Sequence, residues 1–517
     1  MSIKSDGNQN LRPSGNIMRN SMKESTTKRT FLLALATTAL FGFTNQQTAP
    51  LSNEAARKTA NVITGDTLKD FLTFIAADAL QGRDTPSPGL DAAANFIAFN
   101  LKQWGAKPAG DNGTYFQNIT LERTVFDKAA TQVTVGDLTL TLTKDFMMFG
   151  GSNGRVAGPL VVVPKKQDTY DVRGKVVLLG KGLAQEMDRI TKAGALAILT
   201  DSGYSGNSWN AFVDGYSRFA GGFRMPTPAR PDSQGPMTAP MVTISGDAYQ
   251  KLAPLADTKA TLAVAVTKET ATTRNVVAIA EGSDPKLKAE YVAVGAHYDH
   301  IGMDPNAPGP DKIYNGADDD GSGTVSVLNI AKAFLTSSAR PKRSMLFVWH
   351  CGEEKGLWGS EYYTSHMTVP KSSVVAQLNI DMIGRSRKAG DTNPLNKSLT
   401  GPNAIYVIGT TMMSTRLGEI VHGVNGKYLN LDYDKRYDDP KDPNQFFYRS
   451  DHYNYAKNGI PICFWFDGEH EDYHRVGDEV SKIDFTKMEK VARTVYLTGV
   501  TVANEANRPP VDKKLGR

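Results

Sequence analysis

The sequence is poor in cysteine, in runs of one charge and in long apolar segments. Its two cysteines, Cys351 and Cys463, allow at most one disulfide, and the sequence does not decide between that pair and two buried free thiols. No run of Lys or Arg indicates a nucleic-acid partner, and the formal net charge of +5 is small for 517 residues. Beyond the N-terminal region, no segment is apolar enough to predict a membrane helix. The composition is typical of a soluble globular protein, and the length predicts two domains.

Residues 1–46 have the pattern of an export signal with an upstream extension. A Lys-Arg pair precedes an apolar run at 31–43, which is too short to span a bilayer and is followed by small polar residues. A buried helix is the alternative, but the run lacks polar periodicity. Residues 1–21 look like extra sequence, because Met22 would begin a signal of ordinary length. The cleavage zone has no cysteine nearby, so we do not expect a lipid anchor. We therefore expect an exported protein, periplasmic or secreted, without stable membrane association after signal removal.

Residues 148–267 differ from the rest of the chain in their pattern of strand-like runs and turns. Short strand-like runs alternate there with turns rich in Gly and Pro, and one helix-like stretch lies near 184–193. The segment 201–238, rich in Gly, Ser and Pro, is predicted to be a long loop. It would form either a lid over an active site or a surface excursion.

The chain on both sides of this region shows helical and strand periodicity. Residues 66–80 and 90–104 each place apolar side chains on one helical face. After residue 274, strand-like and helix-like segments alternate, which is typical of an open α/β sheet. The predicted strands are 275–279, 291–296, 344–350, 374–381, 404–409 and 461–466. The predicted helices follow Gly323, cover 356–367 and lie near 413–422.

Five clusters in this α/β region join a His or a carboxylate to a predicted strand end or turn. In chain order they are His297-Tyr-Asp299, Asp318-Asp319-Asp320-Gly-Ser-Gly, Glu353-Glu354, Asp381 and Tyr473-His474. All eight histidines of the chain lie in this region. Imidazole and carboxylate groups are ligands that suit zinc, and strand ends gather at one edge of an open sheet. The clusters therefore predict a site for a pair of zinc ions.

The order and local sequence of these clusters resemble peptidase family M28, the co-catalytic zinc aminopeptidases. The matching stretches are GAHYDHIG (295–302), NGADDDGSG (315–323), GEEKGLWGS (352–360), LNIDMIGR (378–385), RSDHYNYAKNGIP (449–461) and DYHRVGDE (472–479). The resemblance implies an α/β fold in which residues 47–147 and 268–517 form an open mixed β-sheet flanked by helices. Residues 148–267 resemble an inserted protease-associated domain, a small β-rich module.

The resemblance also implies which residues hold the metals. His297 and Asp381 would bind one zinc, Glu354 and His474 would bind the other, and Asp319 would bridge the two. Two nearby dications repel each other, so a bridging carboxylate is needed between them. Asp318 and Asp320 could instead cap the turn. The main alternative at this cluster is that the bridging carboxylate lies one position before or after Asp319.

Other residues are expected to act beside the metals. Glu353 would be the general base that takes a proton from a metal-bridging water. Tyr473 would either polarise the substrate carbonyl or only pack. Asp299 would accept the second N–H of the His297 imidazole, and Asp451 and His452 would contact the ligands from behind. The other histidines are expected to be structural or surface residues: His300, His350, His366, His422 and His470. At His300 many relatives carry a small residue, so this histidine could alter the pocket rim.

The sequence therefore predicts an exported exopeptidase with two zinc ions per chain, most simply an aminopeptidase acting on peptides. A carboxypeptidase or dipeptidase of the same fold is an alternative, because Arg385, Arg387 and Arg449 lie near the site clusters and such relatives use clustered arginines. A binding protein on an inactive peptidase scaffold is a second alternative. It is disfavoured because all five ligand positions and the base are present. The sequence makes no prediction of the oligomeric state.

Overall fold

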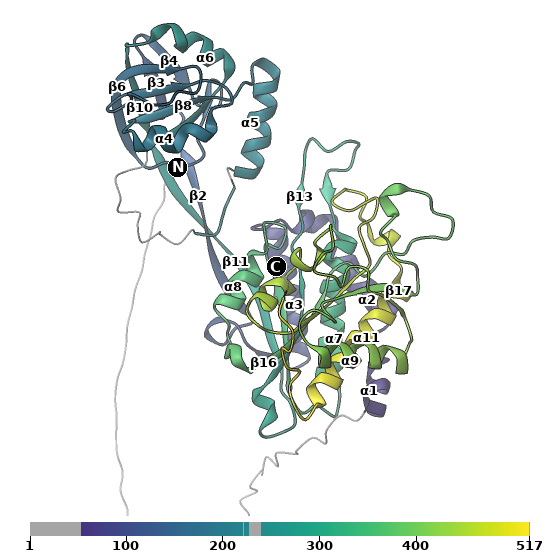
Figure 1. Cartoon of the computed structure of the whole chain (residues 1–517). Coiled ribbons are helices and arrows are strands. Elements are labelled where there is room, and N and C mark those ends of the chain that lie inside the picture. Colours follow the sequence, from purple (N-terminus) through teal and green to yellow (C-terminus); the bar gives the residue numbers. More distant parts are fainter. Residues whose placement is uncertain (1–52, 221, 227–238, 516–517) are drawn as a thin grey trace, which may run out of the picture. The chain divides into compact units, whose positions relative to one another are not determined.

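The computed structural model describes residues 53–220, 222–226 and 239–515 (Figure 1). The predicted signal and extension, residues 1–46, lie outside these described residues. Within them, no helix is both long enough and apolar enough to cross a membrane. The described strands form two large sheets and a short hairpin made by β13 (Gly302–Met303) and β14 (Ile313–Tyr314).

The first sheet contains nine of the described strands and is of mixed direction. Its order is β1-β11-β15-β12-β16-β19-β17-β18, and β2 also pairs with β11. The strands are β1 (Lys107–Pro108), β2 (Phe116–Phe126), β11 (Val266–Ala280), β12 (Tyr291–His297), β15 (Ser344–His350), β16 (Val374–Ile380), β17 (Ala404–Ile408), β18 (Asp432–Asp434) and β19 (Ile462–Phe466). β15, β12, β16 and β19 are parallel, whereas β11 and β17 run antiparallel beside them. The predicted open mixed sheet is confirmed.

Helices cover both faces of this sheet because its strands are apolar on both sides. Along β15, Met345, Phe347 and Trp349 pack into one core, whereas Leu346 and Val348 pack into the other. The first core also contains side chains of α1 (Asn53–Ala60), α2 (Gly65–Ile75), α3 (Pro88–Gln103), α7 (Gly323–Thr336), α9 (Thr415–Lys427) and α11 (Phe485–Asn504). The second contains side chains of α8 (Trp358–Ser365) and α10 (His452–Lys457). Figure 1 shows α7, α9 and α11 on one side of β16 and α8 on the other.

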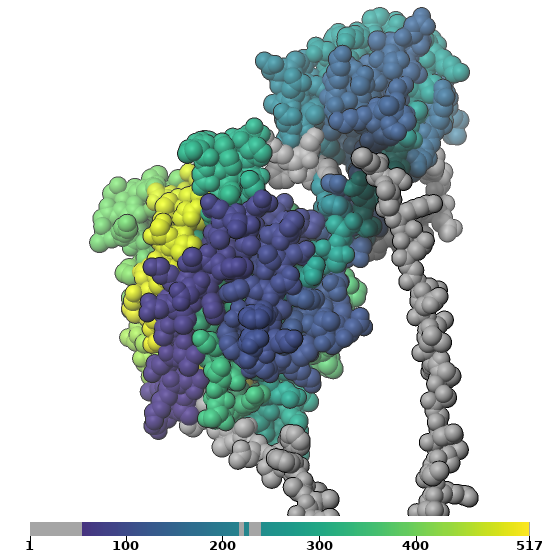
Figure 2. Space-filling view, turned by 180° about the vertical axis from the view of Figure 1, so that it is seen from behind, coloured from purple at the N-terminus to yellow at the C-terminus, as the bar shows by residue number. Residues whose placement is uncertain are grey.

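The two predicted N-terminal helices are confirmed as α2 and α3. The Thr64 and Ser87 side chains cap them by accepting backbone N–H groups, and Pro88 occupies the first turn of α3. Both helices bury one apolar face. Figure 2 shows the N-terminal helices, in purple, beside the C-terminal residues, in yellow, and α1 and α2 pack against α11.

The second sheet contains eight of the described strands, in the order β4-β3-β10-β6-β7-β8-β9-β5. They are β3 (Gln132–Val135), β4 (Leu138–Thr141), β5 (Phe146–Met147), β6 (Gly154–Val163), β7 (Val176–Leu179), β8 (Ala197–Asp201), β9 (Met241–Ile244) and β10 (Lys259–Val264). The short helices α4 (Met187–Lys192) and α6 (Gly246–Leu252) accompany them. The strands predicted within 148–267 are present, but β3, β4 and β5 precede residue 148. This sheet therefore extends upstream of the predicted insert.

The predicted loop at 201–238 is wrong in its first half, where α5 (Gly206–Ala220) forms. Trp209, Phe212 and Tyr216 are spaced at helical intervals, and successive ring centroids lie 5.5 and 6.4 Å apart. The indole N–H of Trp209 donates to the carbonyl of Thr143 at 3.1 Å. The Gly and Ser content suggested a loop, but these ring contacts stabilise a helix. Residues 227–238 lie outside the described part, so the lid and the surface excursion both stay predictions.

Both cysteines are buried free thiols. Cys351 directly follows β15, and Cys463 lies within β19. The alternative of two buried thiols therefore holds in the structure, and no disulfide contributes to this part of the fold.

Candidate metal centre

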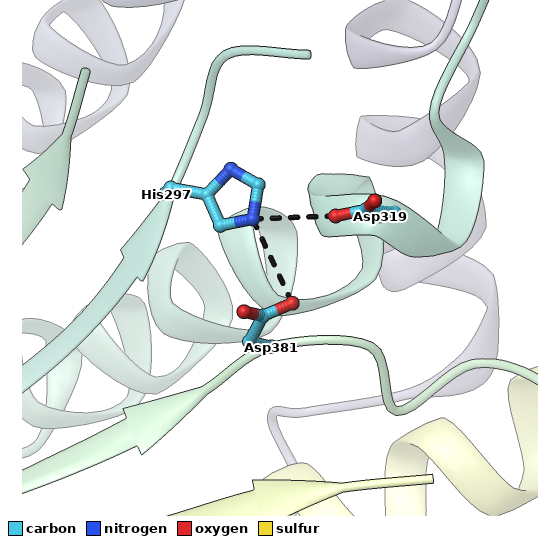
Figure 3. A group of neighbouring side chains, drawn as sticks. All are labelled: His297, Asp319 and Asp381. Carbon is cyan, nitrogen blue, oxygen red and sulfur yellow. Dashed lines mark ion pairs between the residues drawn. The ribbon is translucent and has the colours of Figure 1, made fainter. Parts of the chain in front are cut away.

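Three predicted ligands meet at the carboxyl edge of the first sheet. His297 ends β12, Asp381 directly follows β16, and Asp319 lies in the turn Ala317–Ser322 before α7 (Figure 3). Nε2 of His297 lies 3.3 Å from Oδ1 of Asp319 and 3.6 Å from Oδ1 of Asp381. All three side chains are buried. One imidazole and two carboxylates at these distances form a donor set that suits a divalent cation.

The other two predicted ligands lie on the far side of Asp319. Nε2 of His474 lies 3.1 Å from Oδ2 of Asp319 and 3.1 Å from Oε2 of Glu354. Asp319 therefore presents one carboxylate oxygen to His297 and the other to His474. Glu354 is mostly buried, whereas the His474 side chain is 38% exposed. The structure thus brings all five predicted ligands into one cluster.

The carboxylates on either side of Asp319 accept backbone N–H groups. Oδ1 of Asp318 accepts the N–H of Gly384 at 2.7 Å, and Oδ1 of Asp320 accepts the N–H of Met382 at 3.1 Å. These contacts support Asp319, rather than a residue one position away, as the carboxylate between the histidines. Sequence reasoning missed a further anchor of this turn, Asp478, which accepts the backbone N–H groups of both Asp318 and Asp319. The one sequence feature that pointed to Asp478 was its place in the DYHRVGDE stretch.

The adjacent glutamates lie in a turn after β15. The Glu353 side chain is 12% exposed, and its Oε2 lies 4.0 Å from Nε2 of His297. Burial, together with the charges of Glu354 and Asp381, raises the pKa of Glu353 well above its usual range. Burial also acts to raise the pKa of Glu354, but the imidazoles of His300 and His474 outweigh it and lower that pKa to about 2. The two carboxylates therefore differ in proton affinity, as a base and a ligand would.

Two polar groups contact predicted ligands directly. The backbone carbonyl of Asp299 lies 3.2 Å from Nδ1 of His297, and the Asp299 carboxylate lies 3.7 Å from the same atom. The nearer contact therefore comes from the Asp299 backbone rather than from the predicted carboxylate. The hydroxyl of Ser450 donates to Oδ2 of Asp381 at 2.6 Å. Sequence reasoning did not single out Ser450, although it lies in the RSDH stretch.

Asp451 and His452, which we expected behind the ligands, make other contacts. The Asp451 carboxylate lies 3.3 Å from Nδ1 of His350, and both groups are fully buried. The His452 ring stacks on Phe464 at a centroid distance of 4.4 Å. Burial lowers the pKa of His452 to about 3, so this imidazole is neutral. These residues support the core beside the centre.

A pocket of about 390 Å³ opens beside the cluster. It is lined by Asp319, Glu353, Asp381, Met382, Phe446, Arg449, Ser450, Phe464, Phe466, Glu469, Tyr473 and His474. The Tyr473 ring stacks on His474 at 4.0 Å, and its hydroxyl lies 3.5 Å from Nη2 of Arg449. The pocket therefore combines an apolar aromatic wall with several carboxylates.

The three arginines near the site clusters do not gather at this pocket. Only Arg449 is among its lining residues, and its guanidinium pairs with Glu469 at 2.7 Å. Arg385 is buried and pairs with Asp472 at 2.9 Å. Arg387 donates to the backbone carbonyl of Asp391.

His300 is a residue whose position the sequence did not reveal. We expected a structural or surface histidine, but its ring is fully buried, and Nδ1 lies 2.8 Å from Oε1 of Glu354. The same nitrogen lies 3.8 Å from Oδ2 of Asp319. The one available signal was its place in the GAHYDHIG stretch, three residues after His297.

Arg83 is a second residue that sequence reasoning missed. Its fully buried guanidinium donates to the carbonyls of Ile75, Tyr298, Asn315 and Gly316 at 2.6 to 3.0 Å. Burial lowers its pKa to about 10. Arg83 thereby ties the segment after His297 to the segment before Asp319.

Replacing Arg83 with Ala should destabilise the fold by at least about 3 kcal/mol, because four buried carbonyls would lose a charged donor. Chemical denaturation of the purified variant measures this change. Arg123→Ala is the matched control, because Arg123 is 40% exposed and pairs with Glu269, so its loss should cost under about 1 kcal/mol. Equal stability of the two variants would contradict the structural role of Arg83.

Comparison with known proteins agrees with this geometry. Residues 275–498 match the sequence profile of peptidase family M28. A protein of Aspergillus oryzae, named probable leucine aminopeptidase 2, is 29% identical over 372 residues, which cover 66% of this chain and 65% of that protein. Its namesake from Aspergillus fumigatus is 30% identical over 310 residues, covering 58% of this chain and 52% of that protein. The matches thus span less than two thirds of the length of these relatives.

Among solved structures, an aminopeptidase from Aneurinibacillus sp. strain AM-1 is 19% identical, with a TM-score of 0.49 over 89% of this chain and 99% of that chain. The family match itself includes every predicted ligand, from His297 to His474. Residues 275–498 are thus similar to peptidase family M28.

Proposed function

We propose that this protein is an aminopeptidase with a dinuclear zinc centre. The observation that carries the proposal is the position of Asp319, whose two carboxylate oxygens face different imidazoles, at 3.3 and 3.1 Å. A carboxylate shared in this way can hold two dications close together and offset their repulsion. The match of residues 275–498 to family M28 and the names of the Aspergillus relatives support the same activity.

Two buried oxygens without hydrogen-bond partners support the fit of this donor set to metal ions. Oδ2 of Asp319 and Oε1 of Glu354 are buried without a hydrogen-bond partner. Buried carboxylate oxygens are costly unless they are paired or coordinate a metal. His297, Asp319 and Asp381 would hold one zinc, and Asp319, Glu354 and His474 the other. When bound, the zinc pair supplies Lewis acidity, which lowers the pKa of water and polarises a peptide carbonyl.

The residues beside the ligands supply proton transfer and orientation. Glu353 reaches the pocket and binds protons readily, so it would take a proton from the attacking water and return it to the leaving amine. Tyr473 lines the same pocket, and its hydroxyl would donate to the carbonyl oxygen of the scissile bond. The carbonyl of Asp299 would fix the tautomer of His297 by accepting its second N–H.

The pocket favours a free amine over a carboxylate. Carboxylates of Glu353 and Asp381 line it, and they would attract a protonated α-amine. Its arginine, Arg449, is already neutralised by Glu469. The adjacent wall of Met382 and three phenylalanines would accept an apolar first side chain. These features favour an aminopeptidase over the carboxypeptidase alternative.

A free N-terminus should be required for hydrolysis. Acetylation removes the positive charge and leaves pocket carboxylates without a partner, which costs roughly 1–3 kcal/mol, so kcat/KM should fall by about tenfold to a hundredfold. The measurement compares free and acetylated versions of one short peptide with an apolar first residue. Comparable kcat/KM values would reject the aminopeptidase. If cleavage then followed the C-terminal residue, the carboxypeptidase would replace it, and Arg385, Arg387 and Arg449 would be the first positions to mutate.

We further propose that residues 1–46 direct export to the periplasm or the medium and that residues 148–267 belong to a protease-associated domain. The Lys-Arg pair and the apolar run support the first proposal, and the separate second sheet supports the second. N-terminal sequencing of protein recovered outside the cytoplasm tests the export signal. An intact N-terminus on that protein would contradict it.

A further inference from the structure

Three buried atoms without hydrogen-bond partners converge beside the cluster. They are Nδ1 of His300, Oε1 of Glu354 and Oδ2 of Asp319. Nδ1 of His300 lies 2.8 Å from the Glu354 oxygen and 3.8 Å from the Asp319 oxygen. A cation among these atoms would satisfy all three at once.

We propose that His300 is an additional protein ligand, through Nδ1, to the zinc held by Glu354 and His474. This proposal rests on the proposed zinc chemistry and goes beyond the ligand set that the sequence predicted. The two metal positions would then differ. One would have three protein ligands, and the other would have four: Asp319, Glu354, His474 and His300.

The contact with Glu354 suits shared coordination better than a hydrogen bond. Although His300 Nδ1 lies only 2.8 Å from the Glu354 oxygen, it is not aligned to donate to it, so neither atom has a hydrogen-bond partner. Two metal-binding atoms that approach this closely without hydrogen-bond alignment are expected where both point at a common ion. An imidazole nitrogen and two carboxylate oxygens are suitable zinc ligands.

The surroundings hold the His300 ring in this orientation. A Cβ atom on Gly316 would lie 2.5 Å from Cγ of His300 and 2.4 Å from the carbonyl oxygen of Asp319, so this position has room only for glycine. Gly316 also has φ +55°, which favours glycine. On another side, the His474 ring packs edge-on against His300 at a centroid distance of 5.8 Å. The ring is therefore confined close to the Glu354 and Asp319 oxygens.

The difference in ligand number has a consequence for metal release. To leave the protein, a zinc ion with four protein ligands must lose one more protein bond than an ion with three. The ion near His297 and Asp381 should therefore leave first, and the ion near Glu354 and His300 should leave much later.

A crystal structure of the wild-type protein loaded with zinc tests the ligand directly. Anomalous diffraction at the zinc edge should place one ion about 2.0–2.1 Å from Nδ1 of His300, the usual Zn–N distance. An ion bound to Glu354 and His474 but lying more than about 3 Å from this nitrogen would overturn the proposal.

Metal release in solution gives a second readout that does not depend on activity. With a chromogenic chelator in excess, the wild-type protein should release one zinc quickly and one slowly. His300→Ala and His300→Asn should accelerate the slow phase by about a hundredfold, at least the effect of losing a group that supports a metal ligand. His452→Ala is the matched control, because it also removes a fully buried imidazole but one that stacks on Phe464. Its release rates should match the wild type.

The outcomes separate this proposal from the function on which it rests. A wild-type protein that binds fewer than two zinc ions would reject the dinuclear function itself. Two ions in the wild type, with unchanged release rates in folded His300 variants, would overturn only the role of His300.

Discussion

Glu353→Gln should lower kcat by about a hundredfold or more while both metal ions stay bound. The substitution keeps the size of the side chain and removes its ability to take a proton, and loss of a general base has an effect of this scale. Glu353 lines the pocket, and its carboxylate lies 4.0 Å from Nε2 of His297. Steady-state kinetics on an aminoacyl-anilide measure the change, and metal analysis of the same sample establishes occupancy.

Glu354→Gln is the matched comparison, because it makes the same chemical change one residue away. Glu354 lies 3.1 Å from His474 and 2.8 Å from His300, so its replacement should lower the metal content. If the Glu353 variant instead lost metal and the Glu354 variant kept it, the roles of the two glutamates would be exchanged.

Asp319→Ala should reduce metal binding at both positions and lower hydrolysis by about three orders of magnitude. Asp319 is the group that faces both His297 and His474, so its removal takes a ligand from each ion. Metal ions contribute several kcal/mol of transition-state stabilisation, and each 1.36 kcal/mol corresponds to about tenfold in rate. Treating the wild type with a chelator should reproduce this loss, and zinc should restore activity to the wild type only.

Asp320→Asn is the control for this variant. Burial raises the pKa of Asp320 well above its usual range, and this shift favours the uncharged form of the carboxyl. The Asn side chain can still accept the N–H groups of Gly323 and Met382. This variant should keep both metals. Loss of metal here, with retention in Asp319→Ala, would move the bridging position by one residue.

The sequence predicted the elements whose signals are local. Met345 to Val348 form a continuous apolar run, which is typical of a strand covered on both faces, and they lie in β15. The spacing of Leu68, Leu72 and Ile75 predicted the buried face of α2. Such patterns are set by helix and strand geometry, so they can be recognised from neighbouring residues alone.

The predictions failed where long-range contacts decide the structure. The indole N–H of Trp209 donates to the carbonyl of Thr143, 66 residues earlier in the chain. This hydrogen bond supports α5 in a stretch whose composition resembles a loop. β3 and β4 belong to the second sheet because β3 pairs with β10, more than a hundred residues later. Neither pairing leaves a local signal, so the start of the second sheet was placed too late.

The candidate site divides in the same way. By itself, the sequence determined which chemical groups are available and their order, because its five clusters lie at predicted strand ends or turns in a recognisable order. The ligands in these clusters are His297, Asp319, Glu354, Asp381 and His474. Only the tertiary structure decided which atoms meet, including Asp319 between two imidazoles and His300 against Glu354. The physical reason is that these distances depend on the packing of β12, β15, β16 and the turn before α7 at one sheet edge. A difference of a few ångströms in that packing separates a ligand from a buried histidine of the core.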